Sequence, residues 1–420
     1  MRQGIDLPVL ALLLPIAIAV IIGIGSVDQD GDRSVMLKRI EVPCLPGGAL
    51  PSLTLNQSGN PLISWVDREQ DGTAVLKFAE WQGDRWSPPR EIVRGKTWFV
   101  NWADYPTMAV LEDGTLAVHW LDKISSDTYA YGIKIALSRD GGATWSDPLV
   151  PHTDISPAEH GFLSLKPMGD RFHLAWLDGR ETLKGKPMTL RSRFLAADGS
   201  MSEEILLDDS VCDCCPVDAI VGEEGAVTFY RDRDHMEVRD IAWIQQAKAD
   251  GKPVSSSLVH EDQWIQPGCP VNGPAVSGDS EDWVAVWYTE SESMTAEDRG
   301  AVFLRSMESS EGQYGAVQRI DSGNPLGRVD VCQGADGQYL VCWLEQAGDK
   351  AQVSVRAWEK GSLTSSRWVV AETLPDRISG FPRIVPIPGT SQVLVAYTAF
   401  DEGNRSRVET VLLNLGNDES

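Results

Sequence analysis

The chain has 420 residues and a formal net charge of −24. This excess of carboxylates argues against binding to DNA or RNA, because phosphate contacts need a basic protein face. It also disfavours docking to anionic lipid headgroups and keeps a folded chain soluble. The 15 tryptophans are the one compositional excess, and an aromatic packing position that recurs in every unit of a repeat protein would account for them.

The N-terminal segment is apolar. From Leu7 to Gly25 the chain carries no charge, and Arg2 precedes this stretch while three aspartates follow it. About 20 apolar residues span a bilayer, and a positive flank stays cytoplasmic. A cleaved signal peptide is the other interpretation, because Gly23-Ile24-Gly25 is a small-x-small pattern. Residues 1–26 are thus a signal anchor or a signal peptide. Either one places the rest of the chain in the periplasm or at the cell surface, and an uncleaved segment would anchor it in the inner membrane.

From residue 36 onward, short strands recur in a module of roughly 45 to 55 residues, the period of propeller blades. Each module predicts an apolar inner strand, a tight turn, a second strand that ends in an aromatic residue, and two outer strands. The aromatics are Trp65, Trp120, Trp176, Tyr230, Trp287, Trp343 and Tyr397. These copies predict an all-β, seven-bladed β-propeller over residues 36–415, with six blades as the alternative.

The seventh copy stops near Leu415, before any closing strand. The segment 36–42 (MLKRIEV) resembles the blade-ending segment 85–93 (RWSPPREIV). We therefore expect the first strand of the chain to complete the last blade, because a closed ring leaves no open sheet edge.

The cysteines are concentrated before two inner strands. Cys212, Cys214 and Cys215 fall within four residues at the start of the fourth blade. Cys215-Pro216-Val217-Asp218 is matched by Cys269-Pro270-Val271-Asn272 at the same position of the fifth blade. Since the two blades are neighbours, we expect Cys215 and Cys269 to lie close together beside the central channel. The odd total of seven cysteines leaves at least one as a free thiol or a ligand.

Three interpretations of this cysteine group remain open. In an oxidising compartment the thiols form disulfides that link the loops. Alternatively they bind a soft metal, Cu(I) or Zn, with His160 as an extra ligand. The third interpretation is a redox dithiol. Elsewhere, Cys332 and Cys342 lie on the two arms of one hairpin, and we expect buried core thiols or a cross-strand bridge there.

Charged and polar residues also gather at the starts of the inner strands. Arg231 and Arg233 in the fourth blade could bind an anionic ligand bidentately. Three further residues, Asp218, Asn272 and Asp330, complete this set of ligand-binding candidates. The structural alternative is a solvated network of salt bridges.

One turn carries a family motif. The residues Ser138, Asp140, Gly142 and Trp145 in SRDGGATW match the Asp-box pattern S-x-D-x-G-x-x-W. The chain thereby resembles the Asp-box (BNR-repeat) sialidase-like β-propeller superfamily. It is most similar to an uncharacterised bacterial subgroup with NWADYP-, CDCCP- and GCPVNGP-type segments. The resemblance implies that this turn is a structural element at the edge of a blade.

The same resemblance implies where a sialidase site would lie. Sialidases hold the substrate carboxylate with an arginine triad and use a Tyr/Glu nucleophile pair and an Asp acid/base. Arg328 and Arg383 would supply two triad members, Tyr105 a phenol and Asp104 the acid. The first blade, however, reads Leu50-Pro51-Ser52-Leu53 where the family carries an arginine.

The leading functional hypothesis is therefore a non-enzymatic, extracytoplasmic propeller. It would bind a ligand at the mouth of its channel. The ligand would be a small molecule, a glycan or a soft metal held by the cysteines. The alternatives are a glycoside hydrolase that acts on an anionic sugar, in the manner of an exo-sialidase, and a protein-interaction scaffold.

Overall fold

The computed structural model describes residues 35–291, 300–308, 313–359 and 361–416. The predicted signal anchor or signal peptide, residues 1–26, lies outside these ranges. None of the helices in the described ranges has both the length and the apolar character that a bilayer crossing requires.

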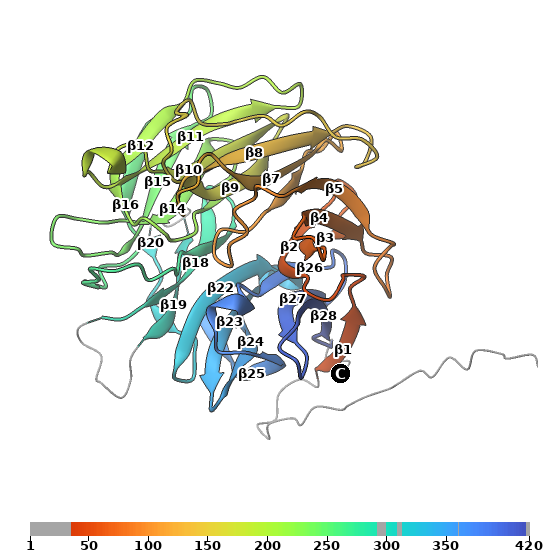
Figure 1. Cartoon of the computed structure of the whole chain (residues 1–420). Helices are drawn as coiled ribbons and strands as arrows, with labels where there is room; N and C mark the ends of the chain where they lie inside the picture. The colour runs from red at the N-terminus through yellow and green to blue at the C-terminus, as the bar shows by residue number, and fades with distance from the viewer. Residues whose placement is uncertain (1–34, 292–299, 309–312, 360, 417–420) are drawn as a thin grey trace, which may run out of the picture.

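Seven antiparallel sheets, arranged in a ring, make up the described chain (Figure 1). The prediction of an all-β, seven-bladed propeller is confirmed, and the six-bladed alternative is wrong. In blades one to six the first strand lies innermost and the later strands follow outward, whereas blade seven runs outward from β26 and ends with β1. Blade one contains β2 (Ala49–Leu55), β3 (Pro61–Arg68), β4 (Ala74–Glu80) and β5 (Arg90–Gly95), and blade two contains β6 (Met108–Val110), β7 (Leu116–Lys123) and β8 (Tyr131–Ser138). Blade three contains β9 (His160–Met168), β10 (Arg171–Asp178), β11 (Met188–Ala196) and β12 (Ile205–Val211), and blade four contains β13 (Asp218–Val221), β14 (Gly225–Arg231), β15 (Ile241–Ala247) and β16 (Pro253–Leu258).

The remaining blades complete the ring. Blade five contains β17 (Ala275–Gly278), β18 (Asp282–Thr289), β19 (Ala301–Glu308) and the short strands β20 (Gln313–Tyr314) and β21 (Gln318–Arg319). Blade six contains β22 (Pro325–Gln333), β23 (Tyr339–Ala347), β24 (Lys350–Glu359) and β25 (Ser362–Thr373). Blade seven contains β26 (Arg383–Pro386), β27 (Gln392–Phe400), β28 (Ser406–Asn414) and, as its outermost strand, β1 (Met36–Glu41).

The first strand closes the ring, as predicted from the sequence. β1 pairs antiparallel with β28, in register from Met36 opposite Asn414 to Glu41 opposite Glu409. Figure 1 shows the two strands side by side, at opposite ends of the colour range. Thr410 also donates a side-chain hydrogen bond to the carbonyl of Ile40, so β1 covers the edge that β28 would otherwise expose.

All seven predicted aromatics lie on the second strand of their blade and are buried. A buried indole N–H needs an acceptor, and in three blades the acceptor is the carboxylate two residues further along the same strand. The pairs are Trp65 with Asp67, Trp176 with Asp178 and Trp343 with Glu345. The repeated aromatic therefore packs between blades while its polar atom stays satisfied.

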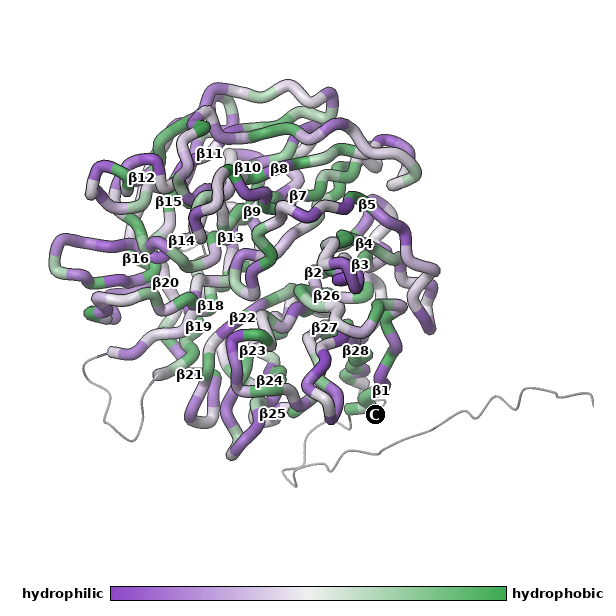
Figure 2. The backbone as a smooth tube through the Cα atoms, viewed as in Figure 1, coloured by the Kyte–Doolittle hydropathy of each residue, from purple (hydrophilic) through white to green (hydrophobic). Residues whose placement is uncertain are grey.

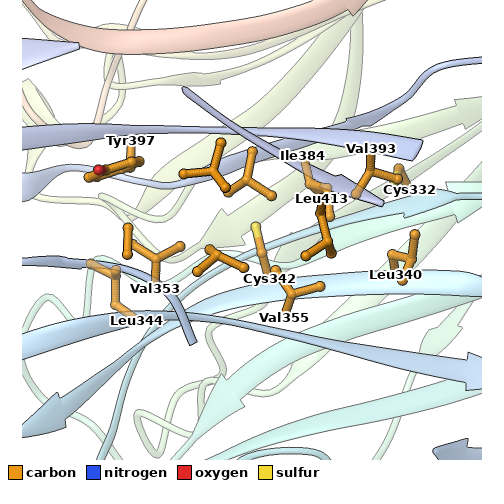
Figure 3. Packing of buried hydrophobic residues seen from close by; sticks show 14 of the residues in the cluster. Cys332, Leu340, Cys342, Leu344, Val353, Val355, Ile384, Val393, Tyr397 and Leu413 are labelled. Carbon is orange, nitrogen blue, oxygen red and sulfur yellow. The ribbon is translucent and has the colours of Figure 1, made fainter. Parts of the chain in front are cut away.

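The apolar residues are concentrated in the strands, whereas the loops at the rim are largely hydrophilic (Figure 2). One core cluster joins blades six and seven and contains Cys332 and Cys342 among aliphatic side chains (Figure 3). Both cysteines are buried free thiols, so the cross-strand bridge is not formed. Burial raises the pKa of both thiols well above the usual value, which keeps them protonated.

The turn after β8 is held by its own side chains. Ser138 Oγ accepts a hydrogen bond from the Gly142 N–H at 2.9 Å, and Asp140 accepts one from the Thr144 N–H at the same distance. Gly142 has a φ of +85°, and a Cβ there would lie 2.4 Å from the Phe78 ring. Trp145 makes an edge contact with that ring, so the turn packs blade two against blade one.

Candidate functional site

Two loops meet where blades four and five adjoin. The loop before β13 carries Cys212, Cys214 and Cys215, and the loop before β17 carries Cys269. A Cβ at Gly273 would lie 1.9 Å from the carbonyl oxygen of Pro216, so glycine is what lets the loops approach this closely. A disulfide joins Cys214 to Cys269. The structure thus brings together the two matched cysteine loops, although Cys269 is bonded to Cys214 and not to Cys215.

The three cysteine sulfurs of the blade-four loop form one compact group, and Cys269 is bonded to one of them. The Sγ atoms of Cys212, Cys214 and Cys215 lie within 4.8 Å of one another, and those of Cys212 and Cys215 are 3.4 Å apart. Cys269 is exposed and Cys214 half-buried, whereas Cys212 and Cys215 are each only 1% exposed. An accessible disulfide therefore covers two buried free thiols.

Two buried arginines lie beside these thiols. Arg239 Nη1 donates to Cys212 Sγ at 3.2 Å, and its Nη2 donates to Glu237 at 2.7 Å. Arg231 donates to the backbone carbonyls of Asn272, Arg239 and Tyr288, at 2.6 to 3.0 Å. Arg231 therefore ties β14 of blade four to the cysteine loop and the second strand of blade five, independently of the disulfide.

The surroundings give the two buried thiols different proton affinities. The hydrogen bond from Cys215 and the charges of Arg231 and Arg239 lower the pKa of Cys212 to about 6. Burial raises the pKa of Cys215 well above its usual value. Within the pair, the negative charge thus favours Cys212 and the proton favours Cys215.

The inner strands surround a central cavity of about 210 Å³. Arg383 and Tyr105 lie in this cavity in direct hydrogen-bond contact, and the Arg383 guanidinium also pairs with Asp330 at 3.4 Å. Lys166 pairs with Asp218 at 2.7 Å. The cations of the cavity are therefore matched by carboxylates.

Four of the predicted site residues accept a hydrogen bond from the backbone N–H of the next blade. Asp104 accepts from Phe162 and Asn272 from Arg328, at 2.8 and 2.7 Å. Asp218 accepts from Val276 and Asp330 from Ile384, both at 3.0 Å. These four side chains link successive inner strands around the channel.

The other predicted arginines each have their own partners. Arg328 lies over the Trp102 ring and donates to the carbonyl of Asp376 at 2.7 Å, and burial lowers its pKa to about 10. Arg233 pairs with Glu237 at 2.7 Å. Arg231, Arg233, Arg328 and Arg383 therefore each have their own partners within the protein.

His160 lies apart from the cysteines, at the start of β9. Its ring stacks on His152 with centroids 4.1 Å apart, and its Nε2 is 3.1 Å from Asp154. Among the residues that the structure describes, the three cysteines of the blade-four loop are the group of His, Cys, Asp or Glu side chains whose ligand atoms converge.

Two features of the site were not predicted from the sequence. Arg239 belongs to the charged cluster after Tyr230, but its alignment with Cys212 depends on how two loops fold. The Tyr131 hydroxyl lies 3.2 Å from Asp104, within hydrogen-bond distance, and also contacts Glu159. Burial raises the pKa of Asp104 to about 8 and that of Glu159 to about 7. Buried carboxyl groups of this kind look like any other Asp or Glu in a sequence.

Neither a family model nor a curated relative matches this sequence. Among solved structures, the chain is similar to the BP39L lectin from Burkholderia pseudomallei, with a TM-score of 0.55, 12% identity, and coverage of 89% of this chain and 98% of the lectin. A protein of unknown function from Dyadobacter fermentans gives a TM-score of 0.49 at 14% identity, covering 91% and 99% of the two chains. The Hadza microbial sialidase Hz136 gives 0.41 at 13% identity, covering 87% of this chain and 65% of the sialidase. At such identities the likeness shows the fold alone, and the chain shares the β-propeller fold with the lectin.

Proposed function

We propose that the protein is an extracytoplasmic β-propeller that binds a soft metal ion, Cu(I) or Zn, through Cys212, Cys214, Cys215 and Cys269. The observation that carries the proposal is the convergence of three cysteine sulfurs from the blade-four loop, one of which is bonded to Cys269 of the adjacent blade. Thiolates select soft metals over the hard cations that prefer oxygen ligands. Two loops that approach through a required glycine supply this set of donors, so backbone geometry holds the sulfurs together.

The charges around the sulfurs support the same function. Several thiolates around a monovalent or divalent ion leave a net negative charge, which is costly to bury without compensation. Arg239 contacts Cys212 directly, and the buried Arg231 lies next to it with its donors used by carbonyl groups. The two guanidiniums would offset the excess negative charge of a metal–thiolate complex. Arg239 also orients the sulfur of Cys212, as partners outside the ligand shell commonly do.

The number of sulfurs engaged distinguishes the two metals. A structural zinc site is four-coordinate and tetrahedral, so zinc would need all four cysteines reduced. Cu(I) accepts fewer thiolate ligands, and Cys212 with Cys215 and one further sulfur would suit it. In both cases the ligands bind as thiolates, so metal uptake releases protons.

The test is the metal content of the full-length protein, purified anaerobically under reducing conditions and exposed to Cu(I) or Zn. We expect close to one equivalent of metal, measured by elemental analysis beside a free-thiol count. The Cys215→Ser/Cys269→Ser double variant is expected to lose the metal, because each loop loses one ligand. The matched control is Cys44→Ser, which removes a half-buried cysteine that hydrogen-bonds to Val408. Reduced wild-type protein that retains neither metal would refute the proposal.

A further inference from the structure

We infer that the Cys214–Cys269 disulfide is a redox gate on the cysteine site, which an external dithiol protein opens to convert two available sulfurs into four. The inference rests on the proposed metal site and adds how that site is controlled and which class of partner acts on it. Its basis is the position of a disulfide directly beside two free thiols.

The burial of the four cysteines makes one sulfur the point of attack. Cys269 is exposed, with Gly268 and Pro267 exposed before it, whereas Cys214 is half-buried. Cys212 and Cys215 are each only 1% exposed. A thiolate of another protein can therefore approach Cys269, while the buried pair is out of reach. This arrangement fits a dithiol reductase that presents a reactive cysteine at its surface.

The exchange is balanced without further reactants. The partner's thiolate attacks Cys269 Sγ, the Cys214–Cys269 bond breaks, and Cys214 leaves as a thiolate. The partner's second thiol then attacks its own sulfur in the mixed disulfide and releases Cys269 as a thiolate. The partner loses two electrons and ends as a disulfide. Its thiol protons pass to Cys214 and Cys269, or to water when a metal takes the thiolates.

The loops stay in place when the disulfide opens. Arg231 donates to the carbonyl of Asn272 in the blade-five loop and to that of Arg239 in blade four. Gly273 packs against Pro216 independently of any sulfur. These contacts hold the two loops at their present separation, so reduction would release Cys214 where it already lies within 4.8 Å of Cys212 and Cys215, with Cys269 next to it. Pre-organised ligands of this kind lower the cost of binding.

The closed and open states differ in what they offer a metal. Disulfide sulfurs carry no charge and are poor ligands, so the closed state leaves Cys212 and Cys215 alone. The open state adds Cys214, which lies within 4.8 Å of both, and Cys269 from the adjacent loop. Reduction therefore completes the four-sulfur set that zinc requires and adds ligands for Cu(I).

The experiment compares two pools of the full-length protein, one purified without reductant and one treated with dithiothreitol and freed of it anaerobically. Alkylation and mass mapping establish which cysteines are oxidised in each pool. Competition with chromophoric chelators then measures the affinities for Cu(I) and Zn. We expect the reduced pool to bind about tenfold more tightly or better, because even partners outside the ligand shell are worth that much.

Two variants separate the gate from the site. Cys214→Ala/Cys269→Ala should show the same affinity in both pools, close to that of the untreated wild type. Cys44→Ala should behave as the wild type. Equal affinities in two wild-type pools whose disulfide states differ would overturn the gate and leave the metal site standing. A disulfide that dithiothreitol opens only after denaturation would likewise overturn the gate alone. A reduced pool that binds neither metal would overturn the metal site, and the gate with it.

Discussion

At Tyr131 a single hydroxyl proton lies between two carboxyl groups. The hydroxyl is within hydrogen-bond distance of Asp104 and Glu159, and it can donate to only one of them. The other carboxyl group must then carry a proton of its own and donate to the tyrosine oxygen. Asp104 fits this role, because burial raises its pKa to about 8. Glu159, whose pKa burial raises only to about 7, ionises before Asp104 and then accepts from Tyr131.

This assignment predicts a pH dependence of stability. A carboxyl group whose pKa rises on folding binds more protons in the folded than in the unfolded state, so its contribution is complete below about pH 4, the unfolded value. The contribution is lost as the pH rises through about 8. Asp104→Asn mimics the protonated form and cannot ionise. We expect the melting temperature of the wild type to fall relative to that of Asp104→Asn between about pH 5 and about pH 9, because the unfolded chain ionises first in this range.

The control for this measurement is Asp113→Asn. Asp113 is exposed in a turn, and its hydrogen bonds to Thr115 lower its pKa. It is therefore ionised in both states across the window, so its substitution should shift the whole profile without changing its slope. Parallel profiles for the wild type and Asp104→Asn would contradict the protonated state of Asp104.

Arg231 offers a second prediction at the scale of one residue. Its guanidinium satisfies three buried carbonyl groups. Arg231→Met keeps much of the volume but leaves these acceptors unpaired, and we expect a loss of about 3 kcal/mol or more of unfolding free energy. Arg233→Ala, which removes a partly exposed ion pair with Glu237, should cost about 1 kcal/mol or less. Urea unfolding of the two variants makes the comparison, and similar losses would contradict the role given to Arg231.

At the scale of the strands, side chains at the channel link each inner strand to the next. Asp218 illustrates the link, because one carboxylate oxygen accepts from the Val276 N–H and the other pairs with Lys166. Asp218→Ala leaves that N–H unpaired, and we expect it to destabilise the protein by about 2 kcal/mol. Asp218→Asn keeps an oxygen for Val276 and should cost clearly less. Equal losses in thermal unfolding would show that the pairing with Lys166, and not the link between blades, is what matters.

The strands were largely predictable from the sequence, whereas the partners of the polar residues were not. The same aromatic position and the same turn recur in successive blades, so Trp65, Trp176 and Trp343 could be aligned from the sequence alone. The partners of Asp104 and Asp330 are backbone N–H groups of the next blade, and a backbone donor leaves no mark in a sequence. For the same reason the hydrogen bond that Arg328 donates to the carbonyl of Asp376 could not be foreseen.

For the cysteine group, the adjacency of the two loops was predictable from the sequence, but the partner of each cysteine was not. The repeated Cys-Pro-Val pattern predicted that the two loops would adjoin. Sequence spacing could not decide whether Cys214 or Cys215 would face Cys269, because a turn of the loop exchanges their directions. The alignment of Arg239 with Cys212 likewise depends on the path of the hairpin after β14.

For the whole molecule, closure of the ring depends on β1. Deleting Met36–Glu41 would expose the edge of β28, remove the buried side chain of Ile40 and leave Thr410 without its acceptor. We expect a loss of about 3 kcal/mol or more, from one buried aliphatic side chain and the lost hydrogen bonds. The matched control is Arg39→Ala, whose ion pair with Glu409 is largely exposed on the arginine side and should be worth about 1 kcal/mol or less. A deletion variant that melts with the wild type would contradict closure by β1.

The pairing of β1 with β28 also determines when the ring can close during synthesis of the chain. β1 is made before every blade and its partner after nearly all of them, so the ring stays open until β28 has been synthesised. A lone strand that waits this long is exposed to pairing with other chains. The composition of β1 limits that hazard, since Lys38, Arg39 and Glu41 are charged and Ile40 is the one residue of the strand that becomes buried. The strand that stays unpaired longest during synthesis thus has a composition that disfavours pairing with another chain.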